Sequence, residues 1–178
     1  IKTHQMIQII CGTNRPDSVS KVISRAYQKI LAEKGHKSSI IELTELPDDF
    51  AFSALYNNAG KNEHFNPFPQ AMFDAQKYEF IVPEYNGSFP GVLKTFIDGL
   101  RFPDTFRNKK AALVGLSSGI QGAGLALSHL TDIFNYCGMH ILAQKPKLMH
   151  IERNLNDNEL SDLYKSLLQE QAELLLDF

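Results

Sequence analysis

The chain has 178 residues, of which 43% are hydrophobic and 21% charged, and its formal net charge is −2. This length fits a single domain over residues 1–178 with a sizeable core, and the composition is ordinary for a soluble globular protein. The lack of a basic excess argues against a nucleic-acid partner, and the apolar runs are far too short to span a membrane.

Strand-like and helix-like segments alternate along the chain. Short apolar runs bounded by turn residues predict five strands, and apolar residues at helical spacing predict the helices that follow them. The strands are expected at residues 6–12, 38–43, 78–83, 110–117 and 140–144. The helices are expected from residue 19 to a stop at Gly35, then at residues 70–77, 90–101 and 121–137, and near the C-terminal end. The segment 45–69 is rich in Asn, Pro and Phe and is expected to be irregular.

The spacing of apolar residues in the last two helices predicts which side chains face the core. Helix 121–137 is expected to turn inward Leu125, Leu130, Ile133, Phe134 and Cys137. Asn156 and Glu159 match a capping box and predict the start of the final helix there. The inward face of that helix is expected to hold Leu160, Leu163, Leu167, Leu168, Leu174 and Leu175.

This alternation is typical of the α/β class, in which a parallel sheet is covered by helices on both faces. Crossovers in such sheets are right-handed, and ligands bind beyond the carboxyl ends of the strands, where the strand order reverses. In a doubly wound sheet of order 2-1-3-4-5, the loops after the first, third and fourth strands would line one crevice. A ligand site is therefore expected at these three loops.

The first loop reads CGTNRPDSVSK at residues 11–21. It offers hydroxyls, an amide and a guanidinium where a helix begins, from Thr13, Asn14, Arg15, Ser18 and Ser20. Because a helix N-terminus also presents unpaired N–H groups and partial positive charge, this set predicts a phosphate site. The alternative is that Ser18 or Asp17 merely caps the helix.

Other phosphate motifs do not fit this loop. The lysine of a Walker loop and the GxGxxG pattern of dinucleotide-binding folds are both missing. A cysteine-based phosphatase loop needs C-x5-R, but Asp17 stands at that offset from Cys11. Cys11 is therefore expected to be a small core residue at the strand end.

The other two loops contain unusual turn residues. Pro83, Glu84, Tyr85, Asn86 and Gly87 follow the third strand, and Gly115, Gly119, Gly122 and Gly124 punctuate the loop after the fourth. Glycines there remove side chains where a flat group could approach the backbone. Glycine-rich turns between strands and helices also occur for steric reasons alone, and that interpretation stays open.

The three loops together resemble the NADPH-dependent FMN reductase family. The resemblance rests on G-T-x-R-x-x-S-x-S, on PEYN-G-S-x-P-G-x-L-K-x-x-I-D and on S-x-G-x-x-G, and it spans roughly residues 6–145. Family members often follow Ile-Asp with Trp, whereas this chain has Gly99 and no tryptophan. The resemblance implies a flavodoxin-like five-stranded fold and quinone, azo-dye or chromate reductase activity.

The resemblance also implies roles for individual residues. Thr13, Arg15, Ser18 and Ser20 would hold the FMN phosphate; Pro83, Glu84, Tyr85, Asn86 and Gly87 would edge the isoalloxazine; and Ser117 and Gly119 would lie near its other side. A flavin needs a flat slot with backbone donors, and Asn86 can donate and accept at the ring edge. Since the flavin carries the hydride chemistry, Glu84 is expected to cap N–H groups or meet a neighbouring subunit rather than act as an acid.

The sequence is compatible with two functions. The first is an FMN-dependent oxidoreductase that takes hydride from NADPH or NADH and passes electrons to a small-molecule acceptor by ping-pong kinetics. The second is a flavodoxin-like electron carrier or redox module without its own NAD(P)H turnover. The broad apolar surface of helix 90–101 predicts a homodimer or a dimer of dimers.

The remaining features bound the setting. Cys11 and Cys137 give no disulfide framework, and no signal-peptide pattern opens the chain, so a reducing, cytoplasmic location is expected. The chain begins at Ile1 without methionine, and its first residues are expected to be processed or added. The histidines show no metal-ligand spacing, and no metal is expected; they are His4, His36, His64, His129, His140 and His150.

Overall fold

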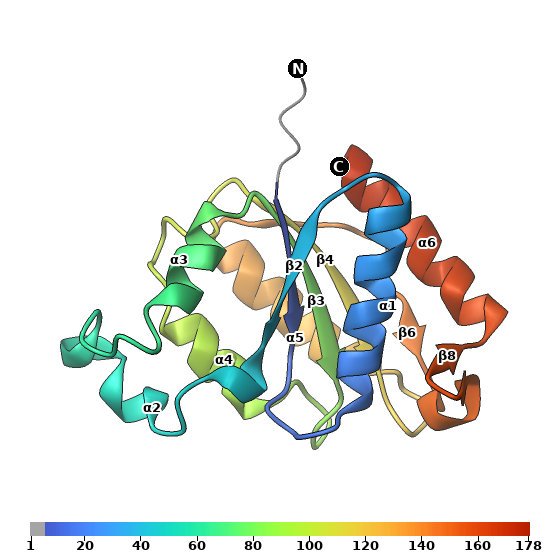
Figure 1. The fold of residues 1–178 in the computed structure, drawn as a ribbon, viewed down its shortest axis with the longest axis horizontal. Helices are drawn as coiled ribbons and strands as arrows, with labels where there is room; N and C mark the ends of the chain where they lie inside the picture. The colour runs from blue at the N-terminus through green and yellow to red at the C-terminus, as the bar shows by residue number, and fades with distance from the viewer. Residues whose placement is uncertain (1–5) are drawn as a thin grey trace.

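The computed structural model describes residues 6–178 as a parallel sheet with helices on both faces (Figure 1). The strands are β1 Ile7–Cys11, β2 Ser38–Glu42, β3 Lys77–Pro83, β4 Lys110–Leu116, β5 His140–Ile141 and β6 Lys147–Leu148. The sheet runs β2-β1-β3-β4-β5, and β6 also pairs with β4. All these pairings are parallel, which confirms the predicted order 2-1-3-4-5. His4 lies outside the described residues.

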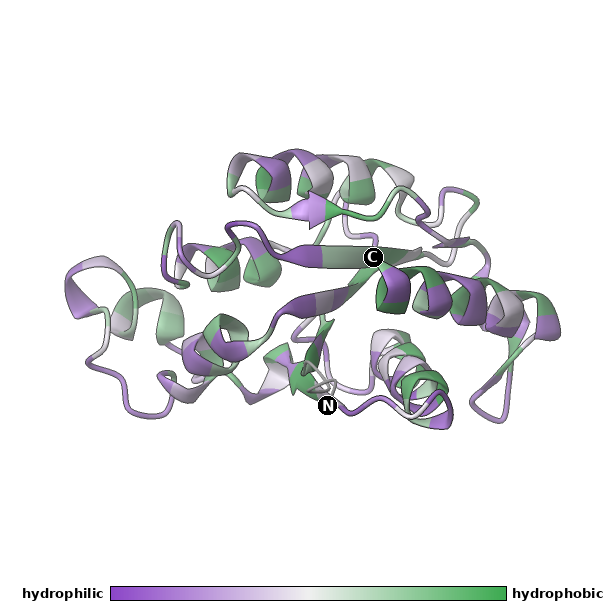
Figure 2. Cartoon of the chain, turned by 90° about the horizontal axis from the view of Figure 1, so that it is seen from above, coloured by the Kyte–Doolittle hydropathy of each residue, from purple (hydrophilic) through white to green (hydrophobic). Residues whose placement is uncertain are grey.

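Two layers of helices enclose the sheet. The helices are α1 Val19–Glu33, α2 Phe50–Ser53, α3 Pro67–Asp74, α4 Gly91–Asp98, α5 Gly124–Tyr136 and α6 Asp162–Asp177. One core cluster joins α1 and α6 to the sheet, and the other joins α3, α4 and α5 to it. Figure 2 shows helices on both sides of the strands, with hydrophobic and hydrophilic residues alternating along their ribbons.

The two core clusters follow from the strand period. Successive side chains of a strand point to opposite faces, so Ile9 and Ile81 pack toward α1 and α6, whereas Ile10 and Phe80 pack toward the other layer. Because both faces are covered, β1 is buried throughout, as its largely apolar run predicts, and even the polar Gln8 is only 2% exposed. This arrangement leaves the loops at the carboxyl ends of the central strands free to form a site.

One acidic side chain lies within the apolar core between the sheet and helices α1 and α6. Glu79, in the middle of β3, is fully buried, and neither of its carboxyl oxygens has a hydrogen-bond partner among the described residues. Burial raises its pKa well above the ordinary value of 4.5, and the nearby Tyr27 hydroxyl offsets this only in part. Burial therefore favours the protonated, neutral form of the Glu79 carboxyl.

The predicted start of the last helix is wrong. Asn156 and Glu159 pair with each other in a hairpin, formed by β7 Leu155–Asn156 and β8 Glu159–Leu160. Asp157 and Asn158 between them have φ of 48° and 64°, the left-handed geometry of a tight hairpin turn. The helix begins only after Ser161.

The later start of α6 also changes its buried face. Leu168 and Leu175 are buried, as predicted. Leu160 is buried too, but it lies in β8 rather than in the helix. Leu163 is 65% exposed and Leu174 is also exposed, so the prediction for these two residues is wrong.

Smaller differences concern element ends. The helix predicted at 121–137 begins at Gly124, and Leu125 is 55% exposed on its outer side rather than inward. The helix predicted at 70–77 begins at Pro67, a residue favoured in a first helical turn. The strand predicted at 140–144 ends at Ile141, and Lys147–Leu148 resumes pairing with β4. The segment 45–69 contains α2 and a 3₁₀ turn at Tyr56–Asn58.

The apolar breadth of α4 is used largely within the chain. Leu93, Phe96 and Ile97 are buried, and Val92 and Leu100 are half-buried against the same core. The exposed rings nearby are Phe102 and Tyr136, which stack with their centroids 6.1 Å apart. α4 therefore leaves little exposed apolar surface for a subunit contact, and the oligomeric state stays a prediction.

Candidate functional site

Three loops meet at the carboxyl ends of β1, β3 and β4, where they enclose a cavity of about 180 Å³. The cavity is lined by seven residues that the sequence singles out: Arg15, Ser18, Ser20, Pro83, Glu84, Tyr85 and Ser117. It lies where the order of the strands reverses, the usual ligand position of this architecture. The prediction that these loops share one crevice is confirmed.

The first loop leaves β1 through a close backbone contact. The Gly12 N–H donates to the carbonyl of Ile81 at 2.9 Å, and a Cβ atom at Gly12 would lie 2.6 Å from that oxygen. Thr13, the next residue, is fully buried, and its Oγ1 accepts from the Arg15 N–H at 3.1 Å. Thr13 thus shapes the loop from below instead of lining the cavity.

A hydroxyl pair connects this loop to the one after β3. Thr13 Oγ1 and the Tyr85 hydroxyl lie 2.6 Å apart. Because Thr13 is buried, this contact fixes the Tyr85 ring against the wall of the cavity. The pair joins two segments 72 residues apart in the chain.

The N-terminus of α1 presents polar groups that make no capping hydrogen bond or ion pair among residues 6–178. Ser18 is the N-cap residue, but its side chain makes no capping hydrogen bond. Ser20 is only 1% exposed, and its Oγ has no hydrogen-bond partner in the part of the chain that the structure describes. Among the described residues, the exposed Arg15 guanidinium forms no ion pair. The interpretation of Ser18 as a side-chain cap is therefore wrong in this structure.

An Asn-Gly turn carries the chain from β3 toward α4. Tyr85 and Ser88 exchange backbone hydrogen bonds of 2.8 and 3.1 Å, and Asn86 and Gly87 between them have φ of 50° and 76°. Two consecutive positive φ angles define a type I′ turn, for which Asn-Gly is the favoured pair. Ser88 Oγ lies 2.8 Å from Nδ1 of His129 and so links the turn to α5. The backbone geometry of the turn thus explains the Asn-Gly sequence at this position.

Glu84 caps another element, as one of the two alternatives predicted. Its Oε2 accepts from the backbone N–H of Ala123 at 3.1 Å. Ala123 is the N-cap of α5 and has a left-handed φ of 64°. A carboxylate at a helix N-terminus is stabilised by the unpaired N–H groups and the helix dipole. Glu84 therefore holds the third loop against the second.

The third loop is closed by Ser117. Its Oγ donates to the Gly119 carbonyl at 3.0 Å and accepts from the Gly122 N–H at 2.8 Å. A Cβ atom at Gly115 would lie 2.2 Å from the Gly122 carbonyl oxygen, and one at Gly122 would lie 2.7 Å from the backbone of Lys147. The steric interpretation therefore explains Gly115 and Gly122, whereas Gly119 has open space around it.

Sequence reasoning missed an acidic residue at this cavity. Glu152 lines it, and the Ser118 hydroxyl donates to Glu152 Oε1 at 2.5 Å. That hydrogen bond lowers the pKa of Glu152, and the charges of Arg15 and His150 act in the same direction. The segment around it is tied to the third loop, since the Ile151 N–H donates to the Ser117 carbonyl at 3.0 Å. No local motif marks Glu152.

The remaining predicted residues lie on the same loops but outside the cavity lining. They are Asn14, Asn86, Gly87 and Gly119, together with the buried Thr13. Cys11 lies beneath the first loop, and burial raises the pKa of its thiol above 9.0. A buried thiol with a raised pKa is not a nucleophile, which supports its interpretation as a core residue.

The chain is similar in sequence to known FMN and quinone reductases. A family model described as NADPH-dependent FMN reductase matches residues 6–150. A 2-hydroxy-1,4-benzoquinone reductase from a Burkholderia species is 29% identical over 170 residues, which cover 92% of this chain and 90% of that protein. An NAD(P)H-dependent FMN reductase from Pseudomonas aeruginosa is 34% identical over 136 residues, which cover 71% of this chain and 74% of that protein.

Solved structures share the fold. The flavoenzyme NAD(P)H:(acceptor) oxidoreductase FerB from Paracoccus denitrificans superposes with a TM-score of 0.78 at 24% identity, covering 97% of this chain and 96% of that one. An FMN-dependent NADH-azoreductase from Bacillus anthracis, solved in complex with FMN, has a TM-score of 0.63 at 16% identity, covering 96% and 99% of the two chains. No helix among the described residues has both the length and the apolarity to cross a bilayer.

Proposed function

The chain belongs to the NADPH-dependent FMN reductase family, and on this basis we propose that it is an FMN-dependent oxidoreductase. It takes hydride from NADPH or NADH and reduces quinone-like, azo, flavin or similar small-molecule acceptors. The relatives' names, a benzoquinone reductase and an FMN reductase, support this range. The observation that carries the proposal is the buried, unpartnered Ser20 hydroxyl at the start of α1.

The residues around Ser20 fit a phosphate monoester. A buried hydroxyl without a partner costs free energy unless a ligand supplies one. Ser18 adds a second hydroxyl that caps nothing, and Arg15 adds a positive charge in the same cavity. The N-terminus of α1 contributes N–H groups and partial positive charge, which together favour an anion. Thr13 and Asn14 complete the predicted phosphate loop.

The cavity volume bears on how much of the cofactor is enclosed. At about 180 Å³ it lies below the roughly 300 Å³ at which typical ligand pockets begin, so it suits a phosphate and the atoms next to it. The loops after β3 and β4 would hold the planar ring, through Pro83, Tyr85, Asn86, Gly87, Ser117 and Gly119. FMN, when bound, supplies the hydride chemistry.

The protein's own contribution is to hold the loops around the site in fixed positions and to exclude a second planar partner. The Thr13–Tyr85 contact keeps one aromatic wall fixed, and the Glu84–Ala123 contact keeps the second and third loops at a constant spacing. Fixed walls admit one planar partner at a time, so NAD(P)H must leave before the acceptor enters. Steady-state kinetics are therefore ping-pong, with parallel double-reciprocal plots at several acceptor concentrations.

The proposal extends to the setting of the protein. Cys11 and Cys137 are both free, which supports a cytoplasmic location. The exposed rings of Phe102 and Tyr136 and the exposed Leu125 support a homodimer or homotetramer, which light scattering at micromolar concentration tests directly.

The experiment that tests the cofactor assignment is chromatography of the flavin released from purified protein by heat. FMN is expected, because the first loop closes around a terminal phosphate and the chain lacks a GxGxxG fingerprint. Recovery of FAD, or no affinity for FMN at micromolar concentration, contradicts the proposal.

A further inference from the structure

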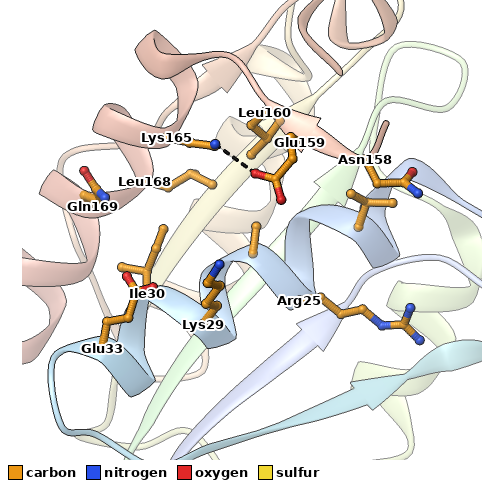
Figure 3. Close-up of a pocket in the computed structure, with 12 residues that line it drawn as sticks. Arg25, Lys29, Ile30, Glu33, Asn158, Glu159, Leu160, Lys165, Leu168 and Gln169 are labelled. Atoms are coloured by element: carbon orange, nitrogen blue, oxygen red, sulfur yellow. Dashed lines mark ion pairs between the residues drawn. The ribbon is translucent and has the colours of Figure 1, made fainter. Parts of the chain in front are cut away.

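A larger cavity lies away from the proposed flavin site, between α1, α6 and the β7–β8 hairpin (Figure 3). Its volume is about 420 Å³, which falls in the range of roughly 300–1,000 Å³ typical of small-molecule pockets. It shares no lining residue with the flavin cavity. Nothing in the reductase chemistry accounts for it.

The floor of this cavity is apolar and comes from three elements. Val22, Ala26 and Ile30 lie one helical turn apart on α1, Leu168 comes from α6, and Leu160 comes from β8. Ile30, Leu160 and Leu168 are buried, so the floor is part of the packed core and has a fixed shape. A hydrocarbon body laid along α1 would lie over the half-buried Val22 and Ala26, with the buried side chains beneath them.

The walls carry an excess of positive charge. Arg25, Lys29 and Lys165 line the cavity with only two carboxylates, Glu33 and Glu159, which leaves one positive charge in excess. Lys165 Nζ lies 2.8 Å from Glu159 Oε2, so these two charges neutralise each other. Within residues 6–178, Arg25 makes neither an ion pair nor a side-chain hydrogen bond.

The polar groups are arranged unevenly along the cavity. Arg25 and Asn158 lie at the end near the hairpin, whereas Glu33 and Gln169 lie at the opposite end (Figure 3). Asn158 is presented there by the left-handed hairpin turn, at φ 64°. The Arg25 guanidinium and the Asn158 amide each offer hydrogen-bond donors of the kind that bind a carboxylate.

We propose that this cavity binds a small amphipathic monoanion, with its hydrocarbon body over Val22, Ala26 and Ile30 and its carboxylate at the Arg25 and Asn158 end. A single negative charge matches the single excess positive charge of the lining. A long neutral hydrocarbon would leave Arg25 unmatched, and a cation would add to the excess positive charge of the lining. The proposal is independent of the flavin chemistry.

The test is a titration of the FMN-loaded protein with decanoate, followed by NMR of the methyl groups of Ala26, Ile30 and Leu168. Saturable shifts at these methyls are expected at millimolar decanoate or below. Decanol has the same hydrocarbon body without the charge and should bind about two- to fivefold more weakly, the size expected for one partly exposed charge pair. Ala26→Leu, which projects into the cavity, should weaken both ligands.

Two arginine substitutions make the charge test specific. Arg25→Gln should weaken decanoate by the same two- to fivefold and leave decanol unchanged. Arg107→Gln removes an exposed arginine on a loop that does not line the cavity and should change neither affinity. Absence of saturable shifts, shifts confined to residues of the flavin cavity, or equal affinities for decanoate and decanol would overturn the proposal.

Discussion

Replacing Ser20 with alanine tests the phosphate site in two opposite directions. Without a ligand, the Ser20 hydroxyl is buried and unpartnered, and such a group costs about 1–3 kcal/mol. Ser20→Ala removes that cost, so the FMN-free protein should become more stable. Since lost packing of one oxygen atom offsets part of the gain, we expect a net increase of about 1 kcal/mol.

The same substitution should weaken FMN binding. A hydrogen bond to a charged phosphate contributes about 1.5–3 kcal/mol, so the dissociation constant should rise about ten- to a hundredfold. Urea denaturation of the FMN-free protein measures the first effect, and calorimetric titration with FMN measures the second. A stability gain combined with an affinity loss is the signature of a residue held ready for a ligand.

Ser24 provides the matched control on the same helix. Its buried hydroxyl already donates to the Ser20 carbonyl at 2.8 Å. Ser24→Ala should therefore lower the stability of the FMN-free protein by about 1 kcal/mol and leave the FMN affinity unchanged. If Ser20→Ala behaves like Ser24→Ala in both assays, the Ser20 hydroxyl faces no ligand and the reasoning fails.

Three further predictions concern other parts of the molecule. Arg15→Gln should raise the FMN dissociation constant about ten- to a hundredfold with no change in the denaturation midpoint of the FMN-free protein, and an unchanged affinity would assign Arg15 to the solvated surface. Asn86→Ala should lower the free energy of unfolding by about 1 kcal/mol, because alanine disfavours the left-handed turn, whereas Asn86→Gly should preserve it. If the Asn86 amide contacts the flavin, both variants should lose turnover about tenfold. Glu79 binds its proton more tightly in the folded state than in the unfolded state, so the stability of the wild-type protein should fall as pH rises above about 4.5. Glu79→Gln should lack this fall. Its stability relative to the wild type should therefore rise by up to about 1.4 kcal/mol per pH unit. Denaturation at about pH 5 and about pH 8 checks this, and parallel profiles would contradict it.

The strand order and both core layers could be predicted because their signal is local and repeated. The run IQIIC in β1 is buried at every position, and such runs alternate with helical spacing along most of the chain. Topology rules for α/β sheets then leave few arrangements. The same regularity placed the loops after β1, β3 and β4 around one cavity.

The predicted start of the last helix is wrong because two turn signals compete in the C-terminal region. Asn156 and Glu159 have capping-box spacing, but Asp157 and Asn158 also favour a hairpin, and the burial of Leu160 in β8 decides for the hairpin. Spacing alone does not show which tertiary contact prevails.

Within the site, sequence reasoning identified residues that stand next to each other in a motif and missed those that meet through the fold. Glu152 reaches the cavity because its segment hydrogen-bonds to the loop after β4, and the chain around it has no distinctive pattern. The Thr13–Tyr85 contact likewise depends on the pairing of β1 with β3. The cap formed by Glu84 was foreseen as an alternative, but its partner Ala123 was not.

The central claim is that this chain is an NAD(P)H-dependent flavin reductase rather than an electron carrier. Anaerobic stopped-flow mixing of the FMN-loaded protein with NADPH, and separately with NADH, tests it most directly through the visible flavin absorbance. We predict that at least one of the two bleaches the flavin within seconds and that a quinone acceptor then restores the absorbance. If the flavin stays unbleached over minutes at millimolar concentrations of both nucleotides, the enzyme assignment is wrong.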